Sequence, residues 1–191
     1  MKLGSKSVVV EAGIGTGRVT NLYIKKAKQV YGFDRAPHML TKLKTNLSDN
    51  LHKIKLDNAD NLNLLEPPEK GDIFIEGWSF GHTVVDNESN YERIVNILVD
   101  EAKRLTKDDG VIIFIETLGS NSEIPKPSTE VLANFYTLLE KKYGFTSHEI
   151  RTDYKFATNA EAARMTGFFF GKKFGEDVLK SKKSIIPEWT G

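Results

Sequence analysis

The sequence predicts an α/β protein with a doubly wound, mostly parallel sheet of seven strands and helices on both faces. Short apolar runs rich in β-branched residues alternate along the chain with segments whose apolar residues recur at helical spacing. The first of these runs ends in the glycine-rich segment Gly13-Ile14-Gly15-Thr16-Gly17. Alternating strands and helices are typical of a parallel sheet that helices cover on both sides. Ligands of such sheets bind at the carboxyl ends of the strands, where the strand order reverses.

The order of elements follows from length and periodicity. Strands are expected at residues 8–11, 30–34, 54–56, 72–76, 111–116, 146–156 and 184–189. Most helices are expected in the intervals between them, each with apolar residues three or four positions apart. Near the C-terminus, Thr158 and Glu161 fit a capping box that begins another helix, which Gly171 and Gly175 would bend or divide.

Composition limits the class of protein. The chain has 191 residues, a formal net charge of +1 and no cysteine, which excludes disulfides, thiolate zinc sites and a cysteine nucleophile. We expect one domain over residues 1–191. The longest apolar run is residues 111–115, too short for a membrane span, and the N-terminus lacks an apolar signal core. We therefore expect a cytoplasmic protein without membrane association, and the four histidines show no metal spacing.

The glycine spacing discriminates between nucleotide-binding motifs. The dinucleotide fingerprint G-x-G-x-x-G would need a third glycine where Arg18 stands, because Gly17 comes one residue early. This spacing argues against NAD or FAD. No Gly-Lys-Ser/Thr follows, so a Walker loop is absent as well.

The surroundings of the glycines carry a family resemblance. The segment 11–17 ends the first strand, Asp34 ends the second, and Asn58-Ala59-Asp60 follows the third. Together with the segments 72–83 and 108–119, they resemble the class I S-adenosylmethionine-dependent methyltransferases over nearly the whole chain. The resemblance implies that the expected strands 146–156 and 184–189 form an antiparallel pair at the end of the sheet.

The same resemblance implies a cofactor site. Its expected members are Glu11, Ala12, Gly13, Gly15, Thr16, Gly17, Asp34, Arg35, Met39, Ala59, Asp60, Glu76, Gly77 and Trp78. Glu11 would receive the ammonium of S-adenosylmethionine directly or through water, and Asp34 would accept from the ribose hydroxyls. Arg35 and Met39 would lie at the adenine, whose amino group Asp60 would bind. Two alternatives stay open: Asp34 as a helix N-cap and Asp60 as a turn aspartate.

Methyl transfer needs few side chains, because the sulfonium is already an activated electrophile. An amine or oxygen acceptor still loses a proton, and His82 and Glu116 at the ends of the fourth and fifth strands are the candidate catalytic groups. His82 is the better placed of the two titratable groups, although a surface or helix-start histidine is the alternative. By family analogy, the acceptor is expected to be a small molecule.

Other interpretations come from different classes of protein. A non-catalytic cofactor-binding protein on the same fold, or an NAD-dependent oxidoreductase, remains an alternative. Nothing indicates nucleic acid: no Asn-Pro-Pro-Tyr-type motif follows the fourth strand, and no basic stripe carries interleaved aromatic residues. The family usually places cover helices before the first strand, where this sequence has only residues 1–7. The chain is then a trimmed core, leaves its site open, or borrows a cover from another subunit. Of these three, we favour self-association as a homodimer in which a second copy closes the crevice.

Overall fold

The computed structural model describes Gly4 and residues 6–191. Contacts between Cα atoms divide the chain into two compact units. Unit 1 is Met1–Glu116 with Asn134–Gly144, and unit 2 is Thr117–Ala133 with Phe145–Gly191. The expectation that residues 1–191 form one domain stays a prediction. The expected homodimer also stays a prediction, because part of the segment 1–7 lies outside the described residues.

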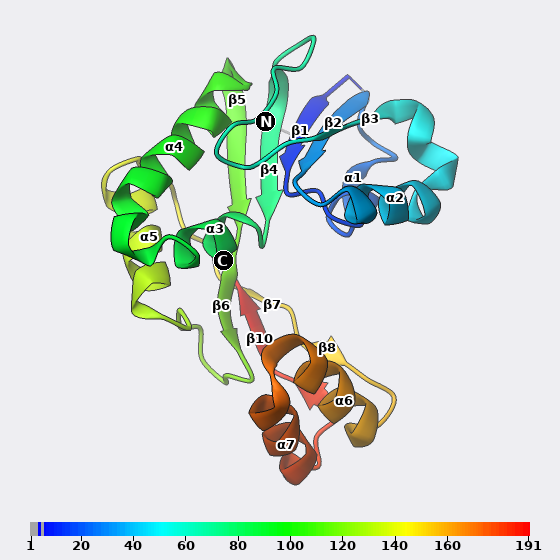
Figure 1. Ribbon diagram of the computed structural model, residues 1–191, viewed down its shortest axis with the longest axis vertical. Coiled ribbons are helices and arrows are strands. Elements are labelled where there is room, and N and C mark those ends of the chain that lie inside the picture. The colour runs from blue at the N-terminus through cyan, green and yellow to red at the C-terminus, as the bar shows by residue number, and fades with distance from the viewer. Residues whose placement is uncertain (1–3, 5) are drawn as a thin grey trace. The chain divides into compact units, whose positions relative to one another are not determined.

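Unit 1 contains the parallel sheet that the alternation of elements predicts. Its strands are β1 (Val8–Ala12), β2 (Gln29–Asp34), β3 (Ile54–Asn58), β4 (Gly71–Gly77) and β5 (Thr106–Ile115). They pair in the order β3-β2-β1-β4-β5, every pair parallel (Figure 1). The chain therefore leaves β1 on one side towards β2 and returns on the other side at β4. The strand order reverses between β1 and β4, where a ligand is expected.

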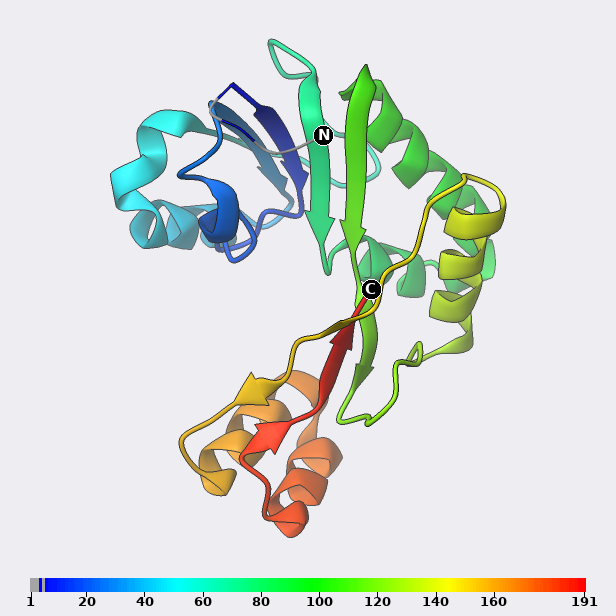
Figure 2. The same ribbon diagram turned by 180° about the vertical axis from the view of Figure 1, so that it is seen from behind.

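Helices cover both faces of this sheet. The helices of the first half of the chain are α1 (Thr20–Tyr23), α2 (Pro37–Asn46) and α3 (Phe80–Val85), with 3-10 turns at Ser48–Lys53 and Glu88–Asn90. They are followed by α4 (Tyr91–Arg104) and α5 (Glu130–Lys141). On one face, apolar side chains of α1 and α2 pack with Val9, Val30 and Ile73 of the strands. Phe80 of α3 packs with Phe74 and Phe114 in an aromatic cluster. In the view from behind, α4 lies alongside β5 (Figure 2). Among the described residues, no helix is both long and apolar enough to cross a membrane.

The C-terminal strands differ from the expected seven-stranded sheet. Unit 2 contains β6 (Thr117–Ser120), β7 (Ile150–Arg151), β8 (Tyr154–Lys155), β9 (Ile185–Ile186) and β10 (Glu188–Thr190). They form one sheet in the order β6-β10-β7 and a separate pair β8-β9, all antiparallel. The parallel sheet thus has five strands, and the prediction of seven in one sheet is wrong. The predicted antiparallel pairing of the two C-terminal segments is confirmed.

Each of these two segments is broken into two short strands for a local reason. Pro187 separates β9 from β10, since proline has no N–H to donate to a ladder. On the other segment, the Asp153 carboxylate takes the Glu188 N–H at 3.1 Å, in the position where a backbone carbonyl would serve a regular ladder. A side chain that competes for backbone donors interrupts strand pairing.

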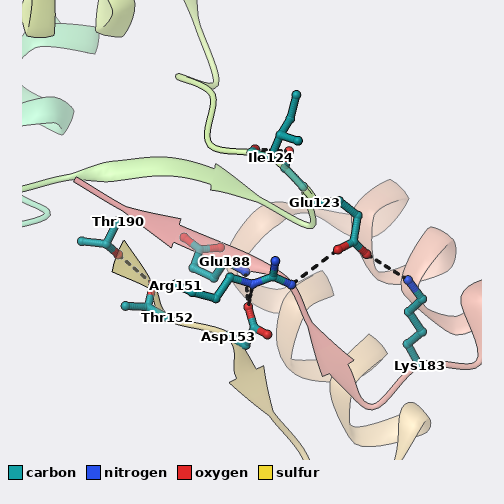
Figure 3. Close-up of polar contacts among 9 residues, drawn as sticks. Glu123, Ile124, Arg151, Thr152, Asp153, Lys183, Glu188 and Thr190 are labelled. Carbon is teal, nitrogen blue, oxygen red and sulfur yellow. Dashed lines mark hydrogen bonds and ion pairs between the residues drawn. The ribbon is translucent and has the colours of Figure 1, made fainter. Parts of the chain in front are cut away.

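A network of charged side chains holds these strands to the loop after β6 (Figure 3). The guanidinium of Arg151 on β7 pairs with Asp153 and lies 3.5 Å from the Glu123 carboxylate. Glu123 also accepts from Lys183 at 3.3 Å, and Thr152 shares a hydroxyl hydrogen bond of 2.8 Å with Thr190. The side chains are partly exposed, so each pair contributes little alone, and the network ties three segments together.

Two helices complete unit 2, α6 (Asn159–Phe170) and α7 (Lys172–Ser181). Gly171, at φ 96°, divides them as the sequence predicts. Gly175 lets the helices approach closely, because a Cβ there would lie 2.6 Å from the Ala163 carbonyl oxygen. The predicted capping box is confirmed at Thr158, whose hydroxyl accepts from Glu161 N at 3.1 Å. The Glu161 carboxylate accepts from Ala157 N at 2.9 Å, one residue earlier than expected.

Removing this cap should destabilise unit 2. Replacing Thr158 by alanine leaves the Glu161 N–H without its side-chain acceptor. We expect the free energy of unfolding to fall by about 0.5–2 kcal/mol, the usual effect of N-cap removal. Urea denaturation followed by circular dichroism measures it, with Thr158→Ser as the control that keeps the hydroxyl. Equal stability of the alanine and serine variants would contradict a capping role.

Candidate functional site

The glycine loop after β1 requires glycine for its backbone conformation. Gly13, Gly15 and Gly17 have φ of 59°, 53° and 82°, the left-handed region in which side chains with a Cβ are strained. A Cβ on Gly13 would lie 2.3 Å from Ser79 Oγ, and one on Gly17 would lie 2.7 Å from a methyl carbon of Leu47. A Cβ on Gly15 would meet no protein atom closer than 3.9 Å. Among the three glycines of the loop, Gly15 is therefore the one where a Cβ would meet no close protein atom.

Asp34 at the end of β2 binds this loop. Its Oδ2 accepts from Gly15 N at 2.8 Å, and its Oδ1 accepts from Ala36 N at 2.8 Å. The N-cap of α2 is Ala36, which makes no side-chain cap, so the alternative of Asp34 as the N-cap is wrong. Asp34 is half-buried, and each carboxylate oxygen has a further lone pair for an outside donor.

The segment after β3 is joined to the same strand end. Asn58 Nδ2 and Ala59 N donate to the Asp34 carbonyl oxygen at 2.8 and 3.2 Å. Asp60 is exposed, and its Oδ1 accepts from Leu62 N at 2.9 Å in a tight turn. The alternative of Asp60 as a turn aspartate is thus observed. Its Oδ2 takes no part in this hydrogen bond, and a contact with adenine stays a prediction.

Two exposed residues follow Asp34 along the chain. Arg35 forms an ion pair of 3.7 Å with Asp86, the residue that ends α3. The Met39 side chain lies on α2, and the residue is 38% exposed. Both therefore lie on the accessible surface next to Asp34. Thr16 in the glycine loop is held through its carbonyl oxygen, which accepts from Asn46 Nδ2 at 3.0 Å.

Glu11 is buried rather than presented to a ligand. The residue is 2% exposed, and its Oε2 accepts from the Thr20 hydroxyl at 2.8 Å and from the Tyr23 hydroxyl. Burial raises the pKa of Glu11 to about 7 against the opposing effect of these hydrogen bonds. The carboxylate thus joins β1 to α1. A direct contact with an ammonium stays a prediction, because the structure does not bring this side chain to the surface.

Two further glutamates are buried where β4 and β5 end. Glu76 Oε2 accepts from Ser79 N, Ser79 Oγ and Phe80 N, each at 3.1 Å, and Glu116 Oε1 accepts from Gly81 N. Both carboxyls cap the first turn of α3. They lie within hydrogen-bond reach of each other, and burial raises the pKa of Glu76. Such a pair is stable in a buried site when one proton is shared between the two groups.

His82 and Trp78 lie on the same β4–α3 connection. His82 is exposed on α3, one turn before Asp86. Trp78 is half-buried against the core of unit 1 and carries the guanidinium of Arg18 over its ring, 4.3 Å from the ring centroid. Its φ of 56° is rare for a bulky residue. Trp78 thus packs against the core beneath the glycine loop, and its predicted role as a wall of the cofactor or substrate pocket stays a prediction.

The structure brings together only part of the predicted site. The glycine loop, Asp34 and Ala59 share backbone hydrogen bonds at one edge of the sheet, while Ala12, Glu11, Glu76 and Glu116 are buried beneath it. Sequence reasoning missed the partners of Glu11, which are Thr20 and Tyr23. Both were detectable in principle, because polar side chains three apart on one helix turn face the same strand. Within Gly4 and residues 6–191, no cluster of three His, Asp or Glu side chains could hold a metal ion.

A parallel sheet with a glycine loop after β1 and an acid after β2 defines a class of nucleoside-cofactor proteins. Residues 9–110 match the methyltransferase domain family. This is more than half of the chain, which therefore belongs to that family, with the class I S-adenosylmethionine-dependent methyltransferase fold. S-adenosylmethionine is the cofactor of the methyltransferases with this fold.

Individual relatives agree with this assignment. An uncharacterized methyltransferase of Geobacillus sp. (strain WCH70) is 30% identical over 111 residues, which are 58% of this chain and 47% of the relative. This chain thus spans about half the length of the curated relatives it matches. The structure of a Bacillus halodurans protein assigned as a methyltransferase superposes with a TM-score of 0.62 at 16% identity, covering 98% of this chain and 91% of that one.

A third similarity concerns a structure with bound ligands. Phosphoethanolamine N-methyltransferase 1 of Haemonchus contortus, in complex with phosphoethanolamine and S-adenosylhomocysteine, superposes with a TM-score of 0.52 at 20% identity. The similarity covers 68% of this chain and 26% of that chain. At this identity, both solved structures show a common fold.

The burial of Glu11 should make stability depend on pH. The pKa of Glu11 is about 7 in the folded protein, above its ordinary value of 4.5. Folding therefore favours the protonated carboxyl, and the free energy of unfolding falls as pH rises from 4.5 to 7. Glu11→Gln removes the ionisation, so its free energy of unfolding should fall less between pH 5 and 8 than the parent's, by on the order of 2 kcal/mol.

Urea unfolding at several pH values measures this difference. Glu88→Gln is the matched control, because Glu88 is exposed. The control should follow the parent curve. Parallel curves for the parent and Glu11→Gln would show that Glu11 does not titrate in this range.

Proposed function

We propose that this chain is an S-adenosylmethionine-dependent methyltransferase that methylates a small molecule. The observation that carries the proposal is the hydrogen bond of 2.8 Å from Gly15 N to Asp34 Oδ2, which joins the glycine loop to an acid at the neighbouring strand end. Glycine backbone and a carboxylate on one edge suit a ligand that combines an amino acid with a ribose. The family match over residues 9–110 supports this chemistry.

The described residues fit the cofactor in two respects. The open space at Gly15 permits close approach of a ligand, since a Cβ there would have no protein neighbour within 3.9 Å. The two oxygens of Asp34 are fixed by backbone N–H groups, so their remaining lone pairs point in set directions towards vicinal hydroxyls. Asp34 would hold the ribose, and Arg35, Met39 and Ala59 would lie along the adenine.

When bound, the cofactor supplies a methyl group on an activated sulfonium, so the chain provides alignment and proton acceptance. We propose His82 as the proton acceptor. Its ring lies on the exposed part of α3, whereas the Glu116 carboxylate is buried and accepts from Gly81 N. A neutral imidazole nitrogen would take the proton of an amine or hydroxyl acceptor.

A small molecule is the proposed acceptor class. The Haemonchus contortus enzyme with this fold has phosphoethanolamine in its complex, which shows that the fold can serve a small acceptor. The formal net charge of +1 gives no electrostatic support for a polyanionic substrate. A non-catalytic role remains the alternative that the experiment must separate.

Calorimetric titration with S-adenosylmethionine tests the cofactor site, and transfer of a labelled methyl group to a panel of small amines, alcohols and thiols tests catalysis. Saturable binding followed by labelling of one acceptor class is the expected result. Binding without labelling of any acceptor would favour a non-catalytic binding protein. Absence of binding by the folded chain would overturn the proposal.

Gly15→Val should abolish cofactor binding. A β-branched side chain at φ 53° is strained, and its methyl groups would enter the open space at Gly15. Calorimetry measures the loss. Gly144→Val is the matched control, since Gly144 also has positive φ (73°) with no atom within 4 Å of a Cβ. The Gly144→Val variant should have comparable backbone strain and should bind S-adenosylmethionine with the parental affinity. Unchanged affinity of Gly15→Val would remove the loop from the site.

Asp34→Ala should weaken cofactor binding by about 1.5–3 kcal/mol, the range for hydrogen bonds to a charged group. Asp34→Asn should weaken it less, because the amide oxygen still accepts from a hydroxyl. Calorimetry of both variants gives the order. Asp57→Ala, at an exposed acid on the adjacent strand β3, is the control and should bind like the parent. If both Asp34 variants bind the cofactor with the parental affinity, Asp34 only accepts hydrogen bonds from the backbone and does not bind the cofactor.

A further inference from the structure

Three consecutive phenylalanines end α6, and two of them are largely exposed. Residues 168–170 lie within one helical turn, where successive side chains are about 100° apart, so they cannot all face the same neighbour. The Phe170 ring packs on Phe174 of α7, with ring centroids 4.8 Å apart. Phe168 and Phe169 are 80% and 68% exposed, and their ring centroids lie 5.1 Å apart. The end of α6 therefore presents a continuous apolar surface of two rings.

Close packing of α6 against α7 supports this surface. The two helices lie side by side in unit 2 (Figure 1). A Cβ on Gly175 would lie 2.8 Å from Gly167 Cα, so glycine is required for this approach. Gly171, at φ 96°, ends α6 and precedes α7. The two rings thus stand on a structured corner, residues 162–175, which we call the α6–α7 corner.

The α6–α7 corner is basic and has no acidic residue, although the whole chain has 27 basic and 26 acidic residues. Its exposed charged residues are Arg164, Lys172 and Lys173. Arg164 lies one helical turn before Phe168 and therefore shares its face of α6. The Cα of Lys172 lies within about 8 Å of the Cα of Phe170, because one residue separates them. Positive charge therefore borders the apolar surface on α6 and at the start of α7.

The lysines of the corner do not stabilise their own helix. They stand in the first turn of α7, which has no acid, and a cation at this end opposes the helix dipole. Lys172 lies 3.8 Å from Glu176, but its side chain is 92% exposed, and such an ion pair is weak. Exposed rings bury little apolar area on folding and also add little to stability. These features therefore indicate a partner outside the chain.

An anionic lipid surface has the chemistry that matches both features. Phenylalanine rings bind at the boundary between headgroups and acyl chains, and neighbouring Lys and Arg are attracted to anionic headgroups. A second copy that packed the same corner against itself would bring like charges together. A stable protein interface buries about 800 Å² on each partner, whereas two phenylalanines supply at most about 500 Å². The charge and the area therefore favour lipid over protein.

We propose that the α6–α7 corner is a peripheral docking site for membranes that contain anionic phospholipid. Phe168 and Phe169 enter the boundary between headgroups and acyl chains. Arg164, Lys172 and Lys173 bind the headgroup phosphates. The chain then lies on the membrane surface without spanning it. This proposal replaces the expectation of a protein without membrane association, and it does not depend on the cofactor or the acceptor.

Sedimentation of the full chain with phospholipid vesicles tests the proposal. The vesicles contain either phosphatidylcholine alone or equal parts of phosphatidylcholine and phosphatidylglycerol. The parent should bind the anionic vesicles roughly tenfold or more tightly than the neutral ones, and added salt should weaken this binding. Equal binding of the two kinds of vesicle, or binding of neither, would overturn the proposal.

A serine substitution tests the contribution of the exposed rings. Phe168→Ser should weaken binding to the anionic vesicles roughly tenfold, because the ring no longer leaves water. Leu22→Ser is the matched control, since Leu22 of α1 is 82% exposed, and it should bind like the parent. Parental binding of Phe168→Ser would overturn the proposal.

Removal of two lysines tests the contribution of charge. The double variant Lys172→Gln with Lys173→Gln should weaken binding roughly fivefold for each charge removed. Lys42→Gln with Lys44→Gln removes the same charge from exposed positions on α2 and is the matched control. The control should bind like the parent. Equal weakening by the two pairs would show attraction by net charge alone and would overturn the proposal.

A tryptophan in place of the ring reports insertion directly. Phe168→Trp should show fluorescence quenching by phospholipid with brominated acyl chains, above the background that Trp78 and Trp189 give in the parent. Leu22→Trp is the control and should show the parental background. Quenching of Phe168→Trp no greater than that background would overturn the insertion of the ring.

Two results would assign the apolar surface to another occupant. Self-association that Phe168→Ser abolishes, with no binding to vesicles, would assign it to a second copy and overturn the docking site. A lower free energy of unfolding of Phe168→Ser without vesicles would show that the ring is covered within the folded chain, and would overturn it as well. We expect the parental free energy of unfolding, measured in urea, because the Phe168 side chain is exposed.

Discussion

The hydrogen bond from Gly15 N to Asp34 Oδ2 is the contact on which the arrangement of the site depends. It forms because β1 and β2 run parallel with Ala12 opposite Phe33, so the two strands end at the same level of the sheet. The loop between β1 and α1 then turns back over β2 only if Gly13, Gly15 and Gly17 adopt positive φ. Ile14 N completes the connection by donating to the Phe33 carbonyl oxygen at 2.9 Å. Loop conformation and carboxylate orientation are therefore set together.

The parallel sheet could be predicted from the sequence because its strands are short, apolar and separated by helical segments. Burial on both faces requires such runs, as in β1, where every residue is buried. The C-terminal strands were less accessible to prediction. Their pairing is interrupted by Pro187 and by the Asp153 carboxylate, which takes a backbone donor. The backbone donor that binds a side-chain oxygen depends on the tertiary structure. The hydrophobic pattern of the sequence does not predict it.

The site shows a different limit of sequence reasoning. Position at a strand end predicts which residues share an edge, and this holds for Gly15, Asp34 and Ala59. It does not predict where a side chain points. Glu11 and Val9 are two residues apart and face the same side of β1, and Val9 packs in the core with α1. The Glu11 carboxylate consequently meets Thr20 and Tyr23 of that helix instead of the crevice.

This burial pattern determines the charge that a ligand encounters. The donors around Glu11 and Glu76 are hydroxyls and backbone N–H groups, which stabilise a carboxylate less than a cation would. Burial accordingly raises both pKa values, and the protonated forms carry no charge into the crevice. Asp34, at the end of β2, is half-buried, and its carboxylate lies against the glycine loop. The negative charge beside the glycine loop therefore comes from Asp34 and not from the buried glutamates.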